Sequence, residues 1–97
     1  MEQENFWVYV LELENGKKYV GHTNNLYRRI QEHKDGRSTY TSKYKINKLL
    51  YYEKHNSRSQ AMKREKFLKS GNGRQWLNQQ LIEQSASWLI GSLIIPT

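Results

Sequence analysis

The segment from Tyr19 to His33 constrains the fold more than any other part of the sequence, because it joins a strand to a short helix through a polar turn. Gly21 and the Thr-Asn-Asn cluster at 23–25 are typical of turns and helix caps. The helix that follows carries one apolar stripe at the spacing i, i+4 and i+7, formed by Leu26, Ile30 and His33. The segment therefore predicts a strand, a tight turn and a helix with one buried face.

Three side chains that can contact a phosphate group come together in this segment. Tyr19 lies at the end of the strand, and Arg29 and His33 lie one turn apart on a flank of the helix. His33 also belongs to the apolar stripe, so packing in the core is an alternative role for it.

A β-hairpin is predicted around the start of this segment. Residues 6–13 are rich in aromatic and branched side chains and predict a strand, and residues 18–21 predict a second strand. The Asn-Gly pair at 15–16 is a strong signal for the turn between them. Tyr9 and Tyr19 are expected to face each other across the hairpin. The alternative is that both are ordinary half-buried strand tyrosines.

The rest of the chain predicts another strand and further helices. Residues 37–48 are polar and basic and predict a long exposed loop, which either follows a phosphate backbone or is merely solvated. Residues 49–53 predict the third strand. Residues 56–59 supply the cap of a second helix that runs to about Ser70. The glycines of 71–73 are expected to end that helix with a left-handed cap.

A third helix is expected from Arg74 to about Gln84. Its expected buried side consists of Trp76, Leu77, Leu81 and Ile82. Residues 85–97 are apolar and uncharged but too short to cross a bilayer as a helix. They form an added core element, a dimer contact or an appendage. The element order is thus β-β-α-β-α plus a C-terminal helix, in one α/β (α+β) domain.

The basic residues are concentrated in the middle of the chain. All 16 Lys and Arg lie between Lys17 and Arg74, where only 4 of the 9 acids occur, so this segment has a formal charge of +12. A basic segment with interleaved tyrosines indicates a polyanionic partner, most simply nucleic acid. The alternative is a basic surface without a ligand. The absence of cysteine excludes disulfides and thiolate metal sites, and the acidic N-terminus is unlike a secretory signal, so a cytoplasmic protein is expected.

Glu65 is the only acid in the basic second helix. It falls on the same stripe as Ala61 and Leu68, at i, i+4 and i+7. A carboxylate that faces a core is costly unless it is paired or binds a cation. Two alternatives follow: a salt bridge with Lys69 one turn on, or coordination of Mg²⁺, which completes its shell with waters and substrate phosphate.

Taken in order, these motifs resemble the GIY-YIG nuclease family. They are Trp-Val-Tyr at 7–9, Tyr-Val-Gly at 19–21, an Asn-x-x-Arg-Arg-Ile-x-x-His helix at 25–33, and Glu65. The chain is most similar to small single-domain members related to the nuclease domain of the nucleotide-excision-repair excinuclease, from about residue 6 to 81. Each motif alone is weak, but the ordered set is specific.

The resemblance implies a small fold with a three-stranded antiparallel sheet flanked by helices. It also implies hydrolysis of DNA phosphodiester bonds with one divalent metal, Mg²⁺ or Mn²⁺. It carries the two motif tyrosines onto Tyr9 and Tyr19, the family arginine onto Arg29 and the family histidine onto His33. The metal-binding glutamate falls on Glu65.

The chemistry of these residues fits the implied reaction. Arg29 is a permanently charged fork suited to phosphate oxygens. Tyr9 is favoured as the general base and Tyr19 as the partner that orients water or phosphate, although the sequence does not decide between them. A tyrosine pKa near ~10 must be lowered for this task, by Arg29, by the metal or by His22 at the turn. His33 either bonds a tyrosine or moves a proton.

Further contacts with nucleic acid are expected from basic and aromatic residues next to these motifs. They are Arg28, Lys43, Tyr44, Lys45 and Arg64.

The sequence departs from the family pattern at several positions. Trp7 replaces the glycine of the first motif, and valine replaces isoleucine in both motifs, where a strand needs only β-compatible residues. His22 stands where the excinuclease branch often has lysine, which leaves the partner that activates the base open. Asn72 and Asn78 are both candidates for the asparagine that follows the second helix.

The expected function is a metal-dependent DNA endonuclease, with branched, flapped or damaged DNA as candidate substrates and DNA repair as the candidate process. Residues 1–84 are the predicted nuclease domain, and 85–97 the tail. One alternative is a non-catalytic nucleic-acid-binding module; another gives the main role to the tail as a membrane or partner contact. DNA is the expected partner, with a second copy or another protein for targeting, and no membrane association is expected.

Overall fold

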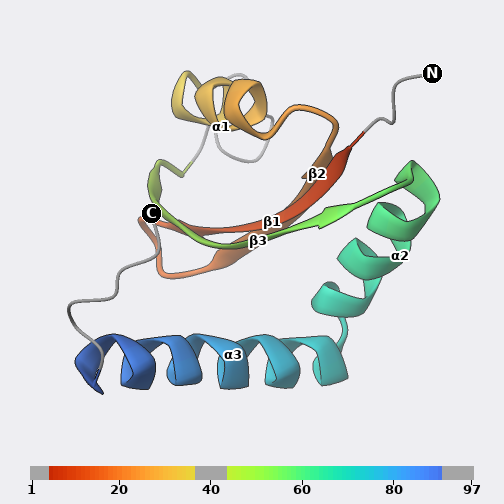
Figure 1. The fold of residues 1–97 in the computed structure, drawn as a ribbon. Coiled ribbons are helices and arrows are strands. Elements are labelled where there is room, and N and C mark those ends of the chain that lie inside the picture. The colour runs from red at the N-terminus through yellow and green to blue at the C-terminus, as the bar shows by residue number, and fades with distance from the viewer. Residues whose placement is uncertain (1–4, 37–43, 91–97) are drawn as a thin grey trace.

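The computed structural model describes residues 5–36 and 44–90, and for residues 84–90 it describes the backbone alone. The elements, in chain order, are β1 Phe6–Leu13, β2 Lys18–Thr23, α1 Leu26–Lys34, β3 Ile46–His55, α2 Arg58–Lys69 and α3 Gly71–Ile90. The three strands form one antiparallel sheet in the order β2-β1-β3, with α1 on one face and α2 and α3 on the other (Figure 1). The predicted fold class and element order are confirmed.

The hairpin between β1 and β2 follows from its turn residues. Gly16 has φ +83°, a left-handed conformation that favours glycine. The Leu13 amide donates to the Lys17 carbonyl at 2.9 Å, and the Lys17 amide donates to the Asn15 side chain at 3.0 Å. β2 includes Gly21, as predicted, but it continues to Thr23, so the prediction of a turn at His22 is wrong.

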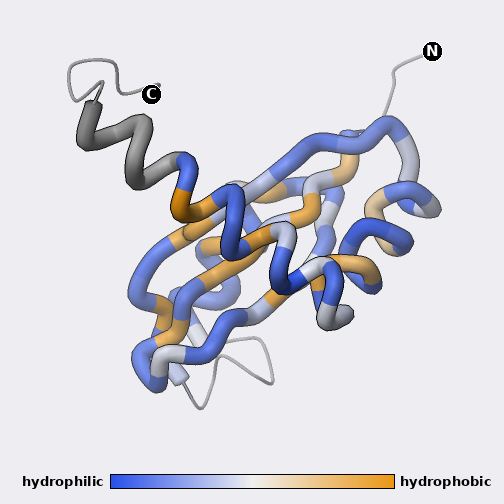
Figure 2. The backbone as a smooth tube through the Cα atoms, turned by 90° about the horizontal axis from the view of Figure 1, so that it is seen from below, coloured by the Kyte–Doolittle hydropathy of each residue, from blue (hydrophilic) through white to orange (hydrophobic). Residues whose placement is uncertain are grey.

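β1 is the central strand, and its two faces form two separate cores. Phe6, Val8 and Val10 pack toward α2 and α3, against core residues such as Leu68 and Leu77. Tyr9, Leu11 and Leu13 face α1 and form the second core, which packs against Leu26 and Ile30. Figure 2 shows hydrophobic stretches running along the strands, whereas the helices are mostly hydrophilic with short hydrophobic segments. Burial on both faces fixes the register of β1, because a one-residue slip would exchange the two cores.

The third strand is longer than predicted. It begins at Ile46, which is opposite Leu13, and Lys48 is opposite Glu12. The prediction that residues 46–48 belong to an exposed loop is therefore wrong. Local polarity suggested a loop, but cross-strand pairing with β1 extends the strand. The first part of that predicted loop, residues 37–43, lies outside the described residues.

The junction of α2 and α3 also differs from the prediction. Gly71 and Gly73 do not form a left-handed cap; they are in the first turn of α3. Ser70 is the residue that separates the helices, because its backbone is extended (φ −79°, ψ 165°). Its hydroxyl accepts the Gly73 amide at 3.1 Å, as in an N-cap. A serine three residues before a helical glycine was the signal that could have located this cap.

α3 begins earlier and ends later than predicted, extending to Ile90 beyond the expected end near Gln84. Leu77 is buried, and Trp76 and Leu81 are partly buried against the core, as predicted. Ile82 is 63% exposed, so its predicted burial is wrong. Of the predicted tail, residues 91–97 lie outside the described part of the chain. Within the described residues, no helix is both long and apolar enough to cross a membrane.

Gly73 gives a stability prediction. A Cβ atom there would lie 1.8 Å from the carbonyl oxygen of Phe67 and 2.7 Å from Cα of Leu68, so α3 would have to move away from α2. We expect Gly73→Ala to lower the free energy of unfolding by about 1–3 kcal/mol, as overpacking does. Urea denaturation followed by circular dichroism measures the change.

Gly71→Ala is the matched control, because a Cβ atom there meets nothing within 4 Å. It should leave stability unchanged or raise it by up to about 1 kcal/mol, since alanine favours the helix. Equal effects of the two substitutions would contradict this account of the junction.

Candidate active site

The two motif tyrosines lie on the same face of the hairpin, under α1. Tyr9 is opposite Gly21 and Tyr19 is opposite Leu11, so the tyrosines are diagonal neighbours rather than the directly facing pair that the sequence predicted. Their ring centroids are 6.2 Å apart. The register that the turn sets therefore brings the two hydroxyl-bearing rings side by side.

Gly21 makes room for the Tyr9 ring. A Cβ atom at position 21 would lie 2.6 Å from Oη and 2.8 Å from Cζ of Tyr9. Since real Cβ atoms do not approach so closely, a side chain there would displace the tyrosine. The glycine of the Tyr-Val-Gly motif is thus explained by close packing, which sequence reasoning missed.

His33 bonds the hydroxyl of Tyr9 inside the protein. Its side chain is 1% exposed, and Nε2 lies 2.8 Å from Tyr9 Oη. Burial, together with the positive charge of Arg29, lowers the pKa of His33 to about 4. Burial raises the pKa of Tyr9 to about 12, although a hydrogen bond with Arg29 opposes the rise, so the expected lowering of this pKa by Arg29 is outweighed by burial. At neutral pH the pair is therefore a protonated tyrosine beside a neutral imidazole.

Arg29 brings a fixed positive charge to these rings. Burial works against that charge, but hydrogen bonds with Tyr9, Glu32 and Tyr19 raise its pKa above the ordinary value. Its Nη1 lies 3.1 Å from Glu32 Oε1. Leu26 and Ile30 face the core and hold α1 on the sheet. Arg29 is thus held at the tyrosine pair by the helix that covers it.

Glu65 approaches β2 from the other face of the sheet. Its Oε1 lies 2.8 Å from His22 Nδ1, and its Oε2 lies 3.0 Å from Lys69 Nζ. Partial burial would raise the pKa of Glu65, but the bonds from His22 and Lys69 lower it below its ordinary value. The carboxylate also acts on Tyr9, where its charge is one of the smaller influences that raise the pKa. The candidate site therefore surrounds β2, an edge strand.

Of the two sequence alternatives for Glu65, the salt bridge with Lys69 is present, and the metal ligand stays a prediction. The carboxylate lies on the buried side of α2, between Ala61 and Leu68. Within the described residues there is no cluster of three or more His, Asp or Glu that would enclose a metal. One carboxylate is nevertheless a donor set that Mg²⁺ accepts, because this ion keeps several waters and takes phosphate oxygens from the substrate.

The residues expected to contact nucleic acid are in different situations. Arg28 is exposed at the start of α1, and Tyr44 and Lys45 are exposed just before β3. Lys43 lies outside the described residues. Arg64 is held by the protein: its Nε lies 3.0 Å from Glu53 Oε2.

Glu53 is the centre of a second carboxylate network, which sequence reasoning missed. It accepts hydrogen bonds from Tyr51 at 2.7 Å, from His55 and from Arg64, whose guanidinium lies 4.3 Å from the centroid of the Trp76 ring. Burial opposes the charge of Glu53, but these bonds lower its pKa. The i, i+2, i+4 spacing of its strand residues was the available signal. This network lies under α2 and α3, away from the motif tyrosines.

Comparisons with known proteins give one consistent result. A family model described as the GIY-YIG catalytic domain matches residues 5–78. The UPF0213 protein of Bacillus pumilus (strain SAFR-032) is 30% identical over 91 residues, covering 90% of this chain and 93% of that one. The UPF0213 protein YazA of Bacillus subtilis (strain 168) is 31% identical over 70 residues, 71% of each chain. These names state no activity.

A solved structure is also similar. The solution NMR structure of the UPF0213 protein BH0048 from Bacillus halodurans is 29% identical, and the match covers 78% of this chain and 84% of that one, with a TM-score of 0.48.

The burial of His33 predicts a pH dependence of stability. Its pKa is about 4 in the folded protein against an ordinary 6.5, so between these values the unfolded chain binds a proton that the folded protein does not. Stability from this residue is fully present above pH 6.5 and is lost as the pH falls toward 4. We expect the free energy of unfolding to drop by about 2 kcal/mol between pH 7 and pH 5.

Urea titrations across this pH range measure the drop, with His33→Gln as the comparison. The variant lacks the titrating group and should show a much flatter curve above pH 5. The lowered pKa values of Glu53 and Glu65 act at more acidic pH, below their ordinary 4.5. Identical slopes for the two proteins would show that His33 does not carry the effect.

Proposed function

Because the chain belongs to the GIY-YIG family, we propose that it is an endonuclease that hydrolyses DNA phosphodiester bonds with the help of Mg²⁺ or Mn²⁺. The observation that carries the proposal is the grouping of Tyr9, Tyr19, Arg29 and Glu65 around the edge strand β2. Hydrolysis of a phosphodiester needs a cation at the phosphate and a proton acceptor for the attacking water, and Arg29 and Tyr9 are the proposed sources.

Arg29 binds the scissile phosphate. Its guanidinium remains charged at every relevant pH, and it stabilises the charge that develops on the phosphate oxygens. Glu32 offsets part of that charge before substrate binds, since its carboxylate lies 3.1 Å away. Phosphate oxygens would take the place of that contact or share it.

Tyr9 and His33 act together as the base. Tyr9 is fully buried in this structure, so substrate binding would first have to admit the attacking water to its hydroxyl. Tyr9 would then take a proton from that water as its own proton passes to Nε2 of His33, 2.8 Å away. The resting imidazole is a weak base, because it is buried and lies near Arg29. A phosphate bound to Arg29 offsets that positive charge and makes the imidazole more basic. Tyr19, with its ring beside both residues, orients the water or the phosphate.

Glu65 would hold the divalent metal, an ion that takes its remaining ligands from water and substrate phosphate. When bound, the ion supplies Lewis-acid chemistry and stabilises charge on the leaving oxygen. His22 fixes the orientation of the carboxylate through its 2.8 Å bond. Lys69 covers the other carboxylate oxygen, but its side chain is 55% exposed and can withdraw into solvent.

Branched, flapped or damaged DNA remains the proposed substrate, with a second copy or another protein as the proposed means of targeting. A second candidate function is a nucleic-acid-binding module without catalysis. The observation in its favour is that His22 and Lys69 already occupy both oxygens of Glu65, as in a purely structural ion pair. Removing the charge of Glu65 separates the two functions.

We expect Glu65→Gln to lower the cleavage rate by about 10³-fold while leaving DNA binding unchanged or slightly stronger, because a metal ligand and a negative charge are lost together. Cleavage is measured with Mg²⁺ or Mn²⁺ on supercoiled plasmid, single-stranded, flap and four-way-junction DNA. Binding is measured in a metal chelator.

Glu53→Gln is the matched control, because Glu53 is also half-buried and paired with a histidine and a cation. It lies outside the candidate site and should retain cleavage wherever it remains folded. Full activity of Glu65→Gln would exclude the proposed metal ligand. Binding without cleavage in the wild-type protein would favour the binding module.

Tyr9→Phe keeps the ring over Gly21 and removes only the hydroxyl. We expect cleavage to fall by about 10²–10⁴-fold, the range for a general acid or base. Tyr51→Phe is the control, because Tyr51 has a pKa similarly raised by burial to about 12 but bonds Glu53. Circular dichroism verifies folding of both variants. A larger loss in Tyr19→Phe than in Tyr9→Phe would reverse the roles proposed for the two tyrosines.

A further inference from the structure

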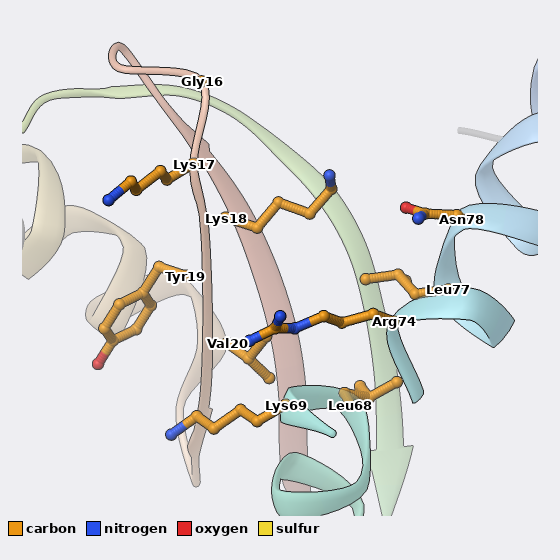
Figure 3. A pocket seen from close by; sticks show the side chains of 10 residues that line it. All are labelled: Gly16, Lys17, Lys18, Tyr19, Val20, Leu68, Lys69, Arg74, Leu77 and Asn78. Atoms are coloured by element: carbon orange, nitrogen blue, oxygen red, sulfur yellow. The ribbon is translucent and has the colours of Figure 1, made fainter. Parts of the chain in front are cut away.

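A groove of about 690 Å³ lies along the outer edge of β2, next to the candidate site. It is bounded by the hairpin turn, β2, the end of α2 and the start of α3 (Figure 3). Four of its lining residues are cationic, Lys17, Lys18, Lys69 and Arg74, and none is acidic.

The groove combines an apolar floor with a cationic rim. Leu68 and Leu77 are almost fully buried in the core below it, and Val20 packs against the same core. Figure 3 shows Arg74 reaching from α3 toward β2, above Val20, and Lys18 extending from β2 on the other side of the gap. A ligand that fits can therefore place an apolar group over Val20 and negative charge among the cations of the rim. A nucleotide does so, with its base and sugar on one side and its phosphate on the other.

The rim cations are available to a ligand. In the part of the chain that the structure describes, the side chains of Lys17, Lys18 and Arg74 form no ion pair, whereas Arg64 is paired with Glu53. Lysines on an edge strand can also serve to prevent pairing with another chain. That role explains Lys17 and Lys18. It does not explain Arg74, which comes from a helix across the groove and would not prevent strand pairing.

Two residues belong to both the groove and the candidate site. Tyr19 lines the groove and lies beside Tyr9, and Lys69 lines the groove and bonds Glu65 at 3.0 Å. The Tyr19 ring points to the α1 side of the sheet, whereas Val20, Leu68 and Leu77 lie on the other side (Figure 3). A strand whose phosphate contacts Arg29 would therefore pass around the edge of β2 to reach the groove. This closeness favours the substrate as the occupant of the groove.

We propose that this groove binds an unpaired nucleotide of the DNA strand, next to the phosphate that is cleaved. Duplex DNA keeps its bases stacked inside and presents only sugar and phosphate, so it cannot use a recessed apolar floor. An unpaired strand can place a base or sugar over Val20, which is only partly buried, and its phosphate among Lys18 and Arg74. The assignment of the neighbouring phosphate as the cleaved one rests on the proposed function, whereas binding of a single strand does not.

The test compares two double variants that remove the same charge. Lys18→Gln with Arg74→Gln removes rim cations, and Lys54→Gln with Lys63→Gln removes exposed lysines outside the groove. Fluorescence anisotropy measures their affinity for a labelled short oligothymidylate in a metal chelator, at several salt concentrations. We expect the rim variant to bind roughly tenfold more weakly and to lose about 1.4 units of salt slope, near 0.7 for each phosphate contact of a single strand. The control should change by much less.

Three outcomes overturn the proposal of a single-strand groove. The first is an equal loss in the control, and the second is an equal loss for oligothymidylate and for a duplex of the same length. The third comes from methyl NMR of the wild-type protein with oligothymidylate, and it is the absence of any shift at the methyl groups of Val20, Leu68 and Leu77. We expect these resonances to shift while those of Leu11 and Leu13 remain in place.

Cleavage kinetics test the position of the groove relative to the chemistry. In an active protein the rim variant should raise KM about tenfold with kcat nearly unchanged, because the groove binds a part of the strand that does not react. An equal loss in kcat would overturn the assignment of the groove to a neighbouring nucleotide. If no cleavage occurs at all, the proposed endonuclease fails, while the anisotropy and NMR results still decide whether the groove binds a single strand.

Discussion

The packing of Tyr9 over Gly21 is the constraint on which the rest of this structure depends. The ring is fully buried under α1, and its hydroxyl ends on Nε2 of His33. Only glycine at position 21 leaves this space, and only one hairpin register puts that glycine opposite Tyr9. The hairpin register that the fold requires is therefore the same register that positions Tyr9 in the candidate site. This packing also fixes α1, since His33 comes from that helix.

β2 separates two halves of the candidate site with different electrostatic character. Under α1, the buried pair of Tyr9 and His33 is uncharged at neutral pH, and Arg29 is the charged group beside it. On the other face, Glu65 is ionised and held by His22 and Lys69. In the proposed function, a phosphate at the edge of β2 would meet Arg29 from one half and the carboxylate of Glu65 from the other. The edge position matters, because a central strand would be covered by its neighbours.

The carboxylate networks of Glu53 and Glu65 have similar partners but differ in how firmly those partners are held. Glu53 and Glu65 each bond a histidine and a cation, but Arg64 at Glu53 is also stacked on Trp76, so it is fixed from two sides. Lys69 at Glu65 is a flexible, exposed side chain that also borders the cationic groove. The first network joins α2 to the sheet. The second can open toward a substrate, which is why its residues, and not those around Glu53, enter the proposed chemistry.

Local residue chemistry was sufficient to predict a large part of this protein. The Asn15-Gly16 turn, the alternation of β1 and the caps of α1 and α2 depend on neighbours in sequence, so the element order and the family followed from them. The sequence also placed Arg29 and His33 on one flank of a helix and Glu65 on the apolar stripe of another.

Only the tertiary structure decided the contacts between residues far apart in the sequence, because local patterns carry no information about which strand or helix a residue meets. Ile46 to Lys48 became strand through pairing with Glu12 and Leu13, and Gly73 became helical where it touches Phe67. The bond from Tyr9 to His33 spans 24 residues and that from His22 to Glu65 spans 43. The sequence by itself determined which groups are available for chemistry. Burial and proximity, which arise only when the chain is folded, decided their protonation and their partners.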